Sequence, residues 1–184
     1  MRKGASMRII AGKAKGHLIY APKGLNTRPT GDRVRESLFN ILQPIITDTY
    51  VLDLFAGSGA LGIEALSRGA KNADFVDRWL PAIKSIEKNL TITKLKDNAS
   101  VYHQDSINFL KRNKKQYDLV FLDPPYNTDL PLKALNLLPM SLKCSGIIII
   151  ETDSSVTMPE TFGKFLTYRK LAYGDTAIWF YKFA

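Results

Sequence analysis

Residues 50–66 read Tyr-Val-Leu-Asp-Leu-Phe-Ala-Gly-Ser-Gly-Ala-Leu-Gly-Ile-Glu-Ala-Leu, and this stretch decides the fold. A short apolar run stops at Gly57-Ser58-Gly59, after which apolar residues return at helical spacing. We predict a strand, a tight glycine turn and a helix. Glycines allow a sharp turn and the close approach of a ligand, and the first turn of a helix offers unpaired N–H groups. A nucleotide-like ligand is therefore expected at this turn.

Glycine spacing alone does not identify that ligand. Gly57, Gly59 and Gly62 satisfy the dinucleotide fingerprint G-x-G-x-x-G, and Asp77 follows about 20 residues later, as that fingerprint expects. The distinction depends on Asp53, which we expect at the carboxyl end of the strand and pointing toward the ligand. A carboxylate repels a pyrophosphate but attracts the ammonium or sulfonium group of S-adenosylmethionine. The sign of this interaction favours S-adenosylmethionine over NAD.

Composition narrows the class of protein further. A chain of 184 residues, 45% of them hydrophobic, fits one folded domain. One cysteine and two histidines are too few for a typical zinc or histidine-based site, so we expect no metal. The sequence shows no apolar run of membrane-span length and no apolar centre of a signal peptide near its start. We therefore expect a cytoplasmic protein.

Positive charge is concentrated in the first part of the chain. The net charge is +9, and the Lys and Arg residues of positions 1–35 face a single acid, Asp32. Such an excess indicates a polyanionic partner, although a solvated basic segment that aids solubility is the alternative. The candidates for contacts with a nucleic-acid backbone are Arg8, Lys13, Lys15, Arg28 and Arg33.

The same basic part is expected to form a small extension. Residues 7–11 and 17–21 predict a hairpin with a basic tip, and Thr30-Gly-Asp32 predicts the N-cap of a helix. We expect residues 1–45 to form a flap in front of the main domain, residues 46–184. The two parts would make one compact unit.

From residue 50 onward the pattern alternates strand and helix, which predicts a doubly wound α/β sheet. Residues 73–77 and 100–103 are the expected second and third strands. Asp77 is placed to accept hydrogen bonds from ribose hydroxyls, with a helix N-cap as the alternative. Asp105 could reach an adenine amino group or cap the next helix. The expected cofactor-binding residues are Asp53, Phe55, Ala56, Gly57, Ser58, Gly59, Asp77, Arg78, Asp105 and Ser106.

A second motif, Asp123-Pro124-Pro125-Tyr126, follows an apolar run at 119–122. Prolines fix φ and remove N–H donors, so carbonyl acceptors face outward beside the Asp123 carboxylate. A flat ring with an exocyclic amino group fits this arrangement, with Tyr126 on its face and Asp123 and the Pro124 carbonyl accepting the amino hydrogens. A turn that only ends a strand would explain the prolines but not the acid-to-aromatic spacing. We predict Asp123, Pro124, Pro125 and Tyr126 as catalytic residues.

The two motifs together resemble those of class I S-adenosylmethionine-dependent amino-methyltransferases. The wider pattern is similar to the bacterial 16S ribosomal RNA guanine-N2 methyltransferases of the RsmD type. That pattern comprises Arg8–Gly12, Thr27–Thr30, Arg33–Asn40, Leu61–Gly69 and Tyr173–Thr176. At Asp77 such proteins would be expected to carry Glu, and the shorter acid should keep the ribose role with a different reach.

The resemblance implies a Rossmann-like fold, a seven-stranded and mostly parallel sheet of order 3-2-1-4-5-7-6 with the last strand antiparallel and helices on both faces. Apolar runs at 146–150, 165–172 and 176–183 agree with its last three strands. It also implies methyl transfer from S-adenosylmethionine, leaving S-adenosylhomocysteine, to the N2 amino group of a guanine in 16S ribosomal RNA. The partner is then ribosomal RNA, free or within the small ribosomal subunit. A chain of this size with one active site needs no partner subunit, so we expect a monomer.

Two other functions stay open on the residues alone. The Asp-Pro-Pro-Tyr cluster accepts any exocyclic amino group, so a DNA adenine-N6 or cytosine-N4 methyltransferase is the first. The second is a catalytically silent RNA-binding module that uses the cofactor fold as a scaffold. An NAD-dependent oxidoreductase is disfavoured, because the sequence offers neither an evident general acid nor a second substrate domain.

Overall fold

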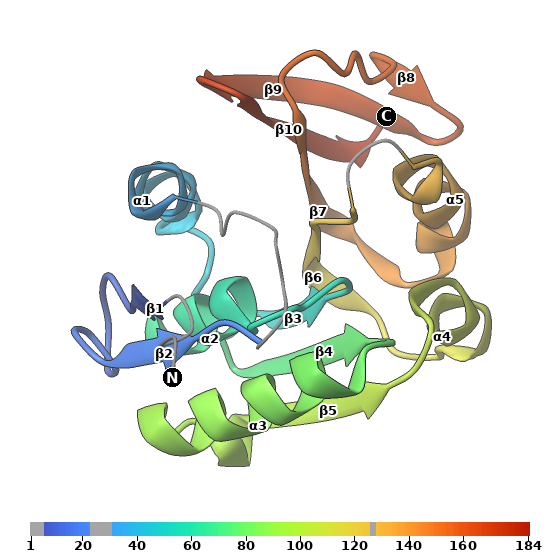
Figure 1. The fold of residues 1–184 in the computed structure, drawn as a ribbon. Helices are drawn as coiled ribbons and strands as arrows, with labels where there is room; N and C mark the ends of the chain where they lie inside the picture. The colour runs from blue at the N-terminus through green and yellow to red at the C-terminus, as the bar shows by residue number, and fades with distance from the viewer. Residues whose placement is uncertain (1–5, 23–30, 126–127) are drawn as a thin grey trace.

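The computed structural model describes residues 6–22, 31–125 and 128–184, and an eight-stranded sheet is the main feature of these residues (Figure 1). Its strands are β3 (Tyr50–Asp53), β4 (Asn72–Asp77), β5 (Ala99–His103), β6 (Tyr117–Leu122), β7 (Leu142–Asp153), β8 (Thr161–Phe162), β9 (Phe165–Tyr173) and β10 (Thr176–Phe183). They lie in the order β5-β4-β3-β6-β7-β10-β9-β8. Strands β3 to β7 are parallel to one another, and β10 is antiparallel to both of its neighbours.

The predicted order and the antiparallel last strand are confirmed, but the strand count is wrong by one. Beyond the expected seven, β8 pairs antiparallel with the start of β9. It has two residues, Thr161 and Phe162, which is too short for any periodicity to appear in the sequence. Gly163, with φ of 58°, turns the chain back between the two strands.

Helices cover both faces of the sheet (Figure 1). One face carries α1 (Asp32–Leu42), α2 (Ala60–Ser67) and α3 (Leu80–Thr93), and the other carries α4 (Ser106–Arg112) and α5 (Leu130–Leu137). Two short 3-10 helices, η1 (Lys96–Asn98) and η2 (Leu138–Met140), complete the list. Among the helices that the structure describes, none has the length and apolar character that crossing a bilayer requires.

The alternation of side chains along β6 divides the core into two layers. Leu119 and Phe121 join the apolar cluster under α1, α2 and α3, while Val120 and Leu122 join the cluster under α4 and α5. A strand buried on both faces needs an uninterrupted apolar run, which is why this segment lacks the polar alternation of a half-exposed strand.

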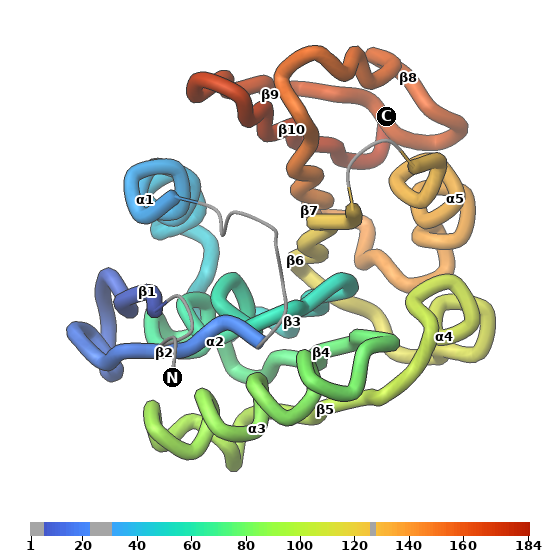
Figure 2. The backbone as a smooth tube through the Cα atoms, viewed as in Figure 1, coloured from blue at the N-terminus to red at the C-terminus, as the bar shows by residue number. Residues whose placement is uncertain are grey.

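The N-terminal extension lies against the face that α2 and α3 cover (Figure 2). Its strands β1 (Ser6–Arg8) and β2 (Leu18–Tyr20) pair antiparallel and are shorter than the predicted 7–11 and 17–21. The backbone of Ile9 still bonds to that of Gly16 and His17, but beyond Ile9 the N–H groups of Ile10 and Ala11 donate to Glu64 in α2, so the hairpin pairing ends there. Met7, Ile9 and Ile19 belong to the same apolar cluster as the central strands.

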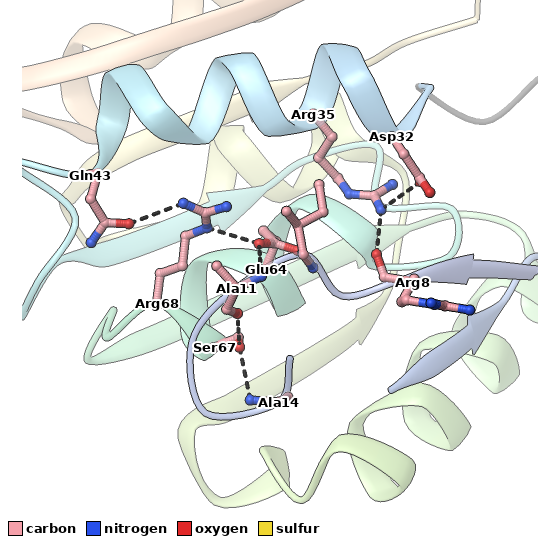
Figure 3. A network of polar contacts seen from close by, with 10 residues as sticks. Arg8, Ala11, Ala14, Asp32, Arg35, Gln43, Glu64, Ser67 and Arg68 are labelled. Carbon is pink, nitrogen blue, oxygen red and sulfur yellow. Dashed lines mark hydrogen bonds and ion pairs between the residues drawn. The ribbon is translucent and has the colours of Figure 1, made fainter. Parts of the chain in front are cut away.

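A buried acid in α2 holds this extension in place (Figure 3). The side chain of Glu64 is 0% exposed. Its carboxylate accepts the N–H of Ile10 at 2.8 Å, the N–H of Ala11 at 3.0 Å and Nε–H of Arg68 at 2.8 Å. Arg68 then donates from Nη1 to Oε1 of Gln43, just beyond α1, at 3.0 Å. One carboxylate thus links the extension and α1 to the helix after the glycine turn.

A buried arginine makes the corresponding link at the start of α1 (Figure 3). Nη2 of Arg35, a side chain that is 0% exposed, donates to the carbonyl of Arg8 at 2.6 Å and to Oδ1 of Asp32 at 2.9 Å. The helix N-cap is Gly31, and among the described residues no side chain caps it. The prediction of an N-cap within Thr30-Gly-Asp32 is therefore met by Gly31. The Asp32 carboxylate does not cap the helix but binds Arg35. Thr30 lies outside the described residues.

We expect Glu64→Ala to lower the free energy of unfolding by about 3–5 kcal/mol, because it leaves Arg68 and two backbone N–H groups without their buried acceptor. Urea unfolding followed by circular dichroism measures the change. Glu64→Gln keeps one acceptor oxygen and should cost less. The matched control is Glu87→Ala on the exposed side of α3, with an expected change within about 0.5 kcal/mol. A Glu64→Ala protein as stable as this control would contradict the assigned role.

Candidate active site

The glycine turn after β3 is built as the sequence predicts, but the strand ends at Asp53, earlier than the apolar run does. Gly57 and Gly59 have φ of 55° and 77°, values that side chains with a Cβ rarely adopt. Gly59 is the N-cap of α2, and its N–H donates to the carbonyl of Ala56 at 2.6 Å. The turn therefore leads directly into the first, positively polarised turn of the helix.

Asp53 is placed at the carboxyl end of β3, as predicted, and its side chain is only 2% exposed. Its Oδ2 accepts the N–H of Gly62, in the first turn of α2, at 3.0 Å. Burial raises the pKa of Asp53 to about 7, a rise that the Gly62 hydrogen bond opposes and the nearby Asp77 carboxylate adds to. One carboxylate oxygen of Asp53 thus holds the first turn of α2, and the buried surroundings disfavour the ionised form of this acid.

Asp77 ends β4 and connects the glycine turn to the next helix. Its Oδ2 accepts the N–H of Gly57 at 2.8 Å, and its Oδ1 accepts the N–H of Trp79, the N-cap residue of α3, at 2.8 Å. The alternative prediction, that Asp77 is the N-cap of α3, is thus wrong in detail. The N-cap is Trp79, and Asp77 accepts the N–H of that residue and not one from the first turn of the helix. Each carboxylate oxygen has a further lone pair, which leaves acceptor capacity for a hydroxyl. Arg78, the next residue, is exposed.

After the end of β5, two further cofactor candidates, Asp105 and Ser106, make structural contacts. Asp105 is the N-cap of α4, with Oδ1 accepting the N–H of Asn108 at 3.0 Å, so the capping alternative is confirmed. Ser106 is buried and donates its hydroxyl to the carbonyl of Leu54 at 2.6 Å. Ser106 therefore holds the start of the glycine turn against α4.

The Asp-Pro-Pro segment follows β6, the parallel neighbour of β3. Asp123 is partly exposed, Pro124 is buried and Pro125 is exposed. The Pro125 carbonyl accepts the hydroxyl of Thr128 at 2.9 Å, so one of the expected outward acceptors already has an internal donor. Tyr126 lies outside the described residues.

Four neighbouring strands, β4, β3, β6 and β7, bring carboxylates to the same edge of the sheet. The partial burial of Asp123 desolvates its carboxyl group and, together with the charges of Glu151 and Asp53, raises its pKa well above the usual range. In the strand register, Leu122 faces Ile150, so Asp123 and Glu151 follow side by side on β6 and β7. We call Asp53, Asp77, Asp123 and Glu151 the acid cluster.

Glu151 is the functional candidate that the sequence reasoning missed. It is 7% exposed and directly follows the apolar run of β7. Its position in the sequence could have revealed it. Glu151 follows the apolar run of the fifth predicted strand, just as Asp123 follows the apolar run of the fourth. Asp77 adds to the rise in the pKa of Asp53, and Glu151 and Asp53 add to that of Asp123, so negative charge is concentrated at this edge and the edge suits a positively charged ligand.

The basic residues predicted to bind nucleic acid are divided between the two ends of the parallel strands. The backbone N–H of Lys13 donates to the carbonyl of Ser67, at the last residue of α2, at 2.8 Å. Since α2 begins at the acid-cluster edge and has 8 residues, the loop with Lys13 and Lys15 lies about 12 Å further along it. Both lysines are exposed.

Arg33 and Arg8 lie nearer the acid cluster. Figure 3 shows α1 running alongside α2 in the same direction, with Gln43 and Arg68 meeting at their final turns. Arg33, in the first turn of α1, is therefore on the acid-cluster edge and is exposed. Arg8 is exposed too, and its carbonyl contacts the α1 residue Arg35. Arg28 lies outside the described residues.

Comparison with known proteins gives matches over nearly the whole chain. The model of the family described as conserved hypothetical protein 95 matches residues 7–182. Ribosomal RNA small subunit methyltransferase D of Haemophilus influenzae is 42% identical over 163 residues, which are 85% of this chain and 84% of that protein.

Solved structures agree on the fold. The Escherichia coli protein yhhF superposes with a TM-score of 0.85 at 36% identity, covering 97% of this chain and 98% of that one. The T. thermophilus 16S rRNA N2 methyltransferase RsmC, in complex with AdoMet and guanosine, superposes with a TM-score of 0.77. RsmC is 22% identical to this chain, and the match covers 99% of this chain and 50% of RsmC. This similarity therefore concerns the fold alone.

We expect the free energy of unfolding to fall as the pH rises from about 4 to about 7. Over this range Asp53 is ionised in the unfolded chain but protonated in the folded one, so the folded state binds more protons and rising pH favours unfolding. The rise in its pKa to about 7 corresponds to up to about 4 kcal/mol. Urea unfolding near pH 5 and near pH 8 measures the effect.

The informative variant is Asp53→Asn, whose amide oxygen can still accept the Gly62 N–H but whose side chain cannot ionise. Its stability should fall less between the two pH values than that of the wild type. The exposed Asp97→Asn serves as control and should keep the wild-type slope. An Asp53→Asn protein with an unchanged slope would contradict the buried-acid assignment.

Proposed function

The chain belongs to the RsmD family of ribosomal RNA small subunit methyltransferases, which the conserved hypothetical protein 95 model describes, and we propose that it methylates the N2 amino group of a guanine in 16S ribosomal RNA. The observation that carries the proposal is the acid cluster beside the Asp-Pro-Pro segment, at the carboxyl ends of adjacent strands. Such an edge is where open α/β sheets bind their ligands. The kinship disfavours the DNA methyltransferase and the silent RNA-binding module.

The proposed methyl donor is S-adenosylmethionine, whose sulfonium carries an electrophilic methyl group. The residues present fit it, because the closely placed carboxylates of Asp53 and Asp123 call for a positive counter-charge. Asp77 retains lone pairs for ribose hydroxyls, and the second oxygen of Asp105 is the acceptor we assign to the adenine amino group. The RsmC neighbour, which shares the fold, was solved with AdoMet. Backbone groups of residues 55–59 would line the rest of the cofactor site.

In the proposed mechanism, Asp123 activates and orients the guanine amine. The N2 lone pair is delocalised into the ring, so it must be aligned with the methyl group and freed from conjugation. Hydrogen bonds from the amine to Asp123 and to the Pro124 carbonyl would do both, and the carboxylate would stabilise the positive charge that develops on nitrogen. Tyr126, outside the described residues, is the proposed stacking partner of the base.

The raised pKa of Asp123 sets a condition on this role. A protonated acid offers a weaker acceptor than a carboxylate, so Asp123 is fully effective only when the nearby charge of Asp53 is compensated. A cation bound at the acid cluster supplies that compensation. The cofactor should therefore bind more tightly as the pH rises, while the fold itself loses stability over the same range.

Residues 1–45 are the proposed RNA-binding flap, with ribosomal RNA, free or within the small subunit, as the partner. Arg8 and Arg33 lie at the first turn of α1, on the acid-cluster side, and would bind phosphates beside the target, while Lys13 and Lys15 would bind phosphates further along the RNA strand. Arg28 remains a candidate from the sequence. One chain supplies every residue of the acid cluster, which agrees with a monomer.

We expect Asp123→Ala to abolish methyl transfer while retaining cofactor binding, because the variant removes the amine acceptor but not the glycine turn. The assay is transfer of labelled methyl to small-subunit ribosomal RNA from cells lacking this protein, offered naked and as assembled subunits, followed by nucleoside analysis. The control is Asp153→Ala. Asp153 is the last residue of β7, at the same end of the sheet, and this variant should stay active.

The expected product is a single N2-methylguanine. An active Asp123→Ala protein would remove the mechanism. A wild-type protein that methylates DNA oligonucleotides but neither form of the ribosomal RNA would replace the proposed substrate by the DNA alternative.

We expect the double variant Lys13→Ala, Lys15→Ala to bind ribosomal RNA more weakly and with a smaller salt dependence. Each lost phosphate contact reduces the slope of log K against log salt by about 0.7 to 0.9. The control is Lys111→Ala, Lys133→Ala on α4 and α5, at the other face of the sheet. Binding is measured by filter retention at several salt concentrations. Equal slopes for the two double variants would remove the loop from the RNA-binding surface.

A further inference from the structure

A cavity lies between the first turn of α1 and the tip of the β9–β10 hairpin. Its volume is about 530 Å³, and its lining consists of Gly31, Asp32, Arg33, Val34, Tyr173 and Gly174. The Tyr173 hydroxyl shares a hydrogen bond with Oγ of Ser37, one turn further along α1. The two walls of the cavity are therefore fastened to each other.

The strand register places this cavity on the acid-cluster edge. Thr176, which begins β10, faces Asp153, and Ile178 faces Glu151 of the acid cluster. The hairpin tip at Tyr173 and Gly174 therefore projects beyond the carboxyl end of β7. The cavity thus lies at the edge where the target base is proposed to bind, on the side that α1 covers.

The walls of the cavity combine a positive charge with an aromatic ring. Arg33 is exposed, and the negative charge of Asp32 is compensated by the buried guanidinium of Arg35 at 2.9 Å. The start of α1 adds the positive end of its helix dipole. Tyr173 is half-buried and lines the opposite wall.

We propose that this cavity receives a nucleotide that flanks the target guanine, with its base against Tyr173 and its phosphate near Arg33. The inference rests on the proposed function and assigns one part of its substrate to a site. Extrusion of a target base leaves its neighbours without a stacking partner, and aromatic and arginine side chains replace that partner in proteins that bind single strands. The cavity volume is within the range of small-ligand sites, so one nucleotide fits.

The test compares variants that separate the ring of Tyr173 from its hydroxyl. Tyr173→Phe keeps the ring and loses the hydrogen bond to Ser37, whereas Tyr173→Leu loses both. We expect Tyr173→Leu to weaken binding of small-subunit ribosomal RNA about tenfold and to raise its KM, with Tyr173→Phe within about twofold of the wild type. Arg33→Ala should weaken binding too, and Arg33→Lys less so. The control is Lys170→Ala, an exposed residue whose ammonium lies over Trp179 on the other face of the hairpin.

Affinity for RNA is measured by filter binding with naked RNA and with assembled subunits, and cofactor affinity by calorimetry with S-adenosylhomocysteine. RNA that carries photoreactive 4-thiouridine should also cross-link to the wild-type protein at Tyr173, as mass spectrometry would show. Equal losses in Tyr173→Phe and Tyr173→Leu would make the residue a structural fastening and overturn the proposal. Unchanged RNA affinity, or a loss of cofactor affinity alone, would overturn it as well.

The proposed function is tested separately by methyl transfer from the wild-type protein. An active wild type whose Tyr173→Leu and Arg33→Ala variants bind RNA normally would overturn the nucleotide site alone. An inactive wild type would overturn the proposed function.

Discussion

The hydrogen bond from the Gly62 N–H to the buried carboxylate of Asp53 joins the end of β3 to the start of α2. This contact fixes where α2 begins, and therefore the path of the glycine turn between them. Asp77 fixes the same turn from the next strand by accepting the N–H of Gly57. The acids that would meet a cationic ligand are thus also the acids that shape its site. A folded chain that keeps such groups so poorly solvated accepts a stability cost at the place where it acts.

Much of the sheet could be predicted because its signals are local. The apolar runs of β3, β6 and β7 are continuous, each ends in an acid or just before one, and the connections have helical spacing. These features place the motif residues at one edge without any knowledge of the contacts between them. The two-residue β8 carries too little pattern for any such inference.

What the sequence could not reveal depends on partners that are distant along the chain. Glu64 appears as an ordinary polar position within a helix, and only the folded chain shows its two backbone donors 53 and 54 residues away. The residues next to Asp105 in the sequence likewise could not show whether it contacts a ligand or caps a helix. Lys13 and Arg33 belong to one basic segment in the sequence, yet they lie at opposite ends of α2. Charge composition indicates a polyanion but cannot tell which basic residues are near the chemistry.

The attachment of the extension also has a consequence for the order in which the protein can fold. Residues 6–20 are synthesised before the sheet, but Ile10 and Ala11 bond to Glu64, and Ile9 packs in a cluster that includes Ile178 and Phe180 of β10. A chain emerging from the ribosome therefore carries an N-terminal hairpin with no surface to dock on until most of the sheet has been made. Contacts of this sequence separation form slowly, because a long loop must close before they stabilise anything. Until then Met7, Ile9 and Ile19 remain apolar groups in water, and such groups promote aggregation of a nascent chain.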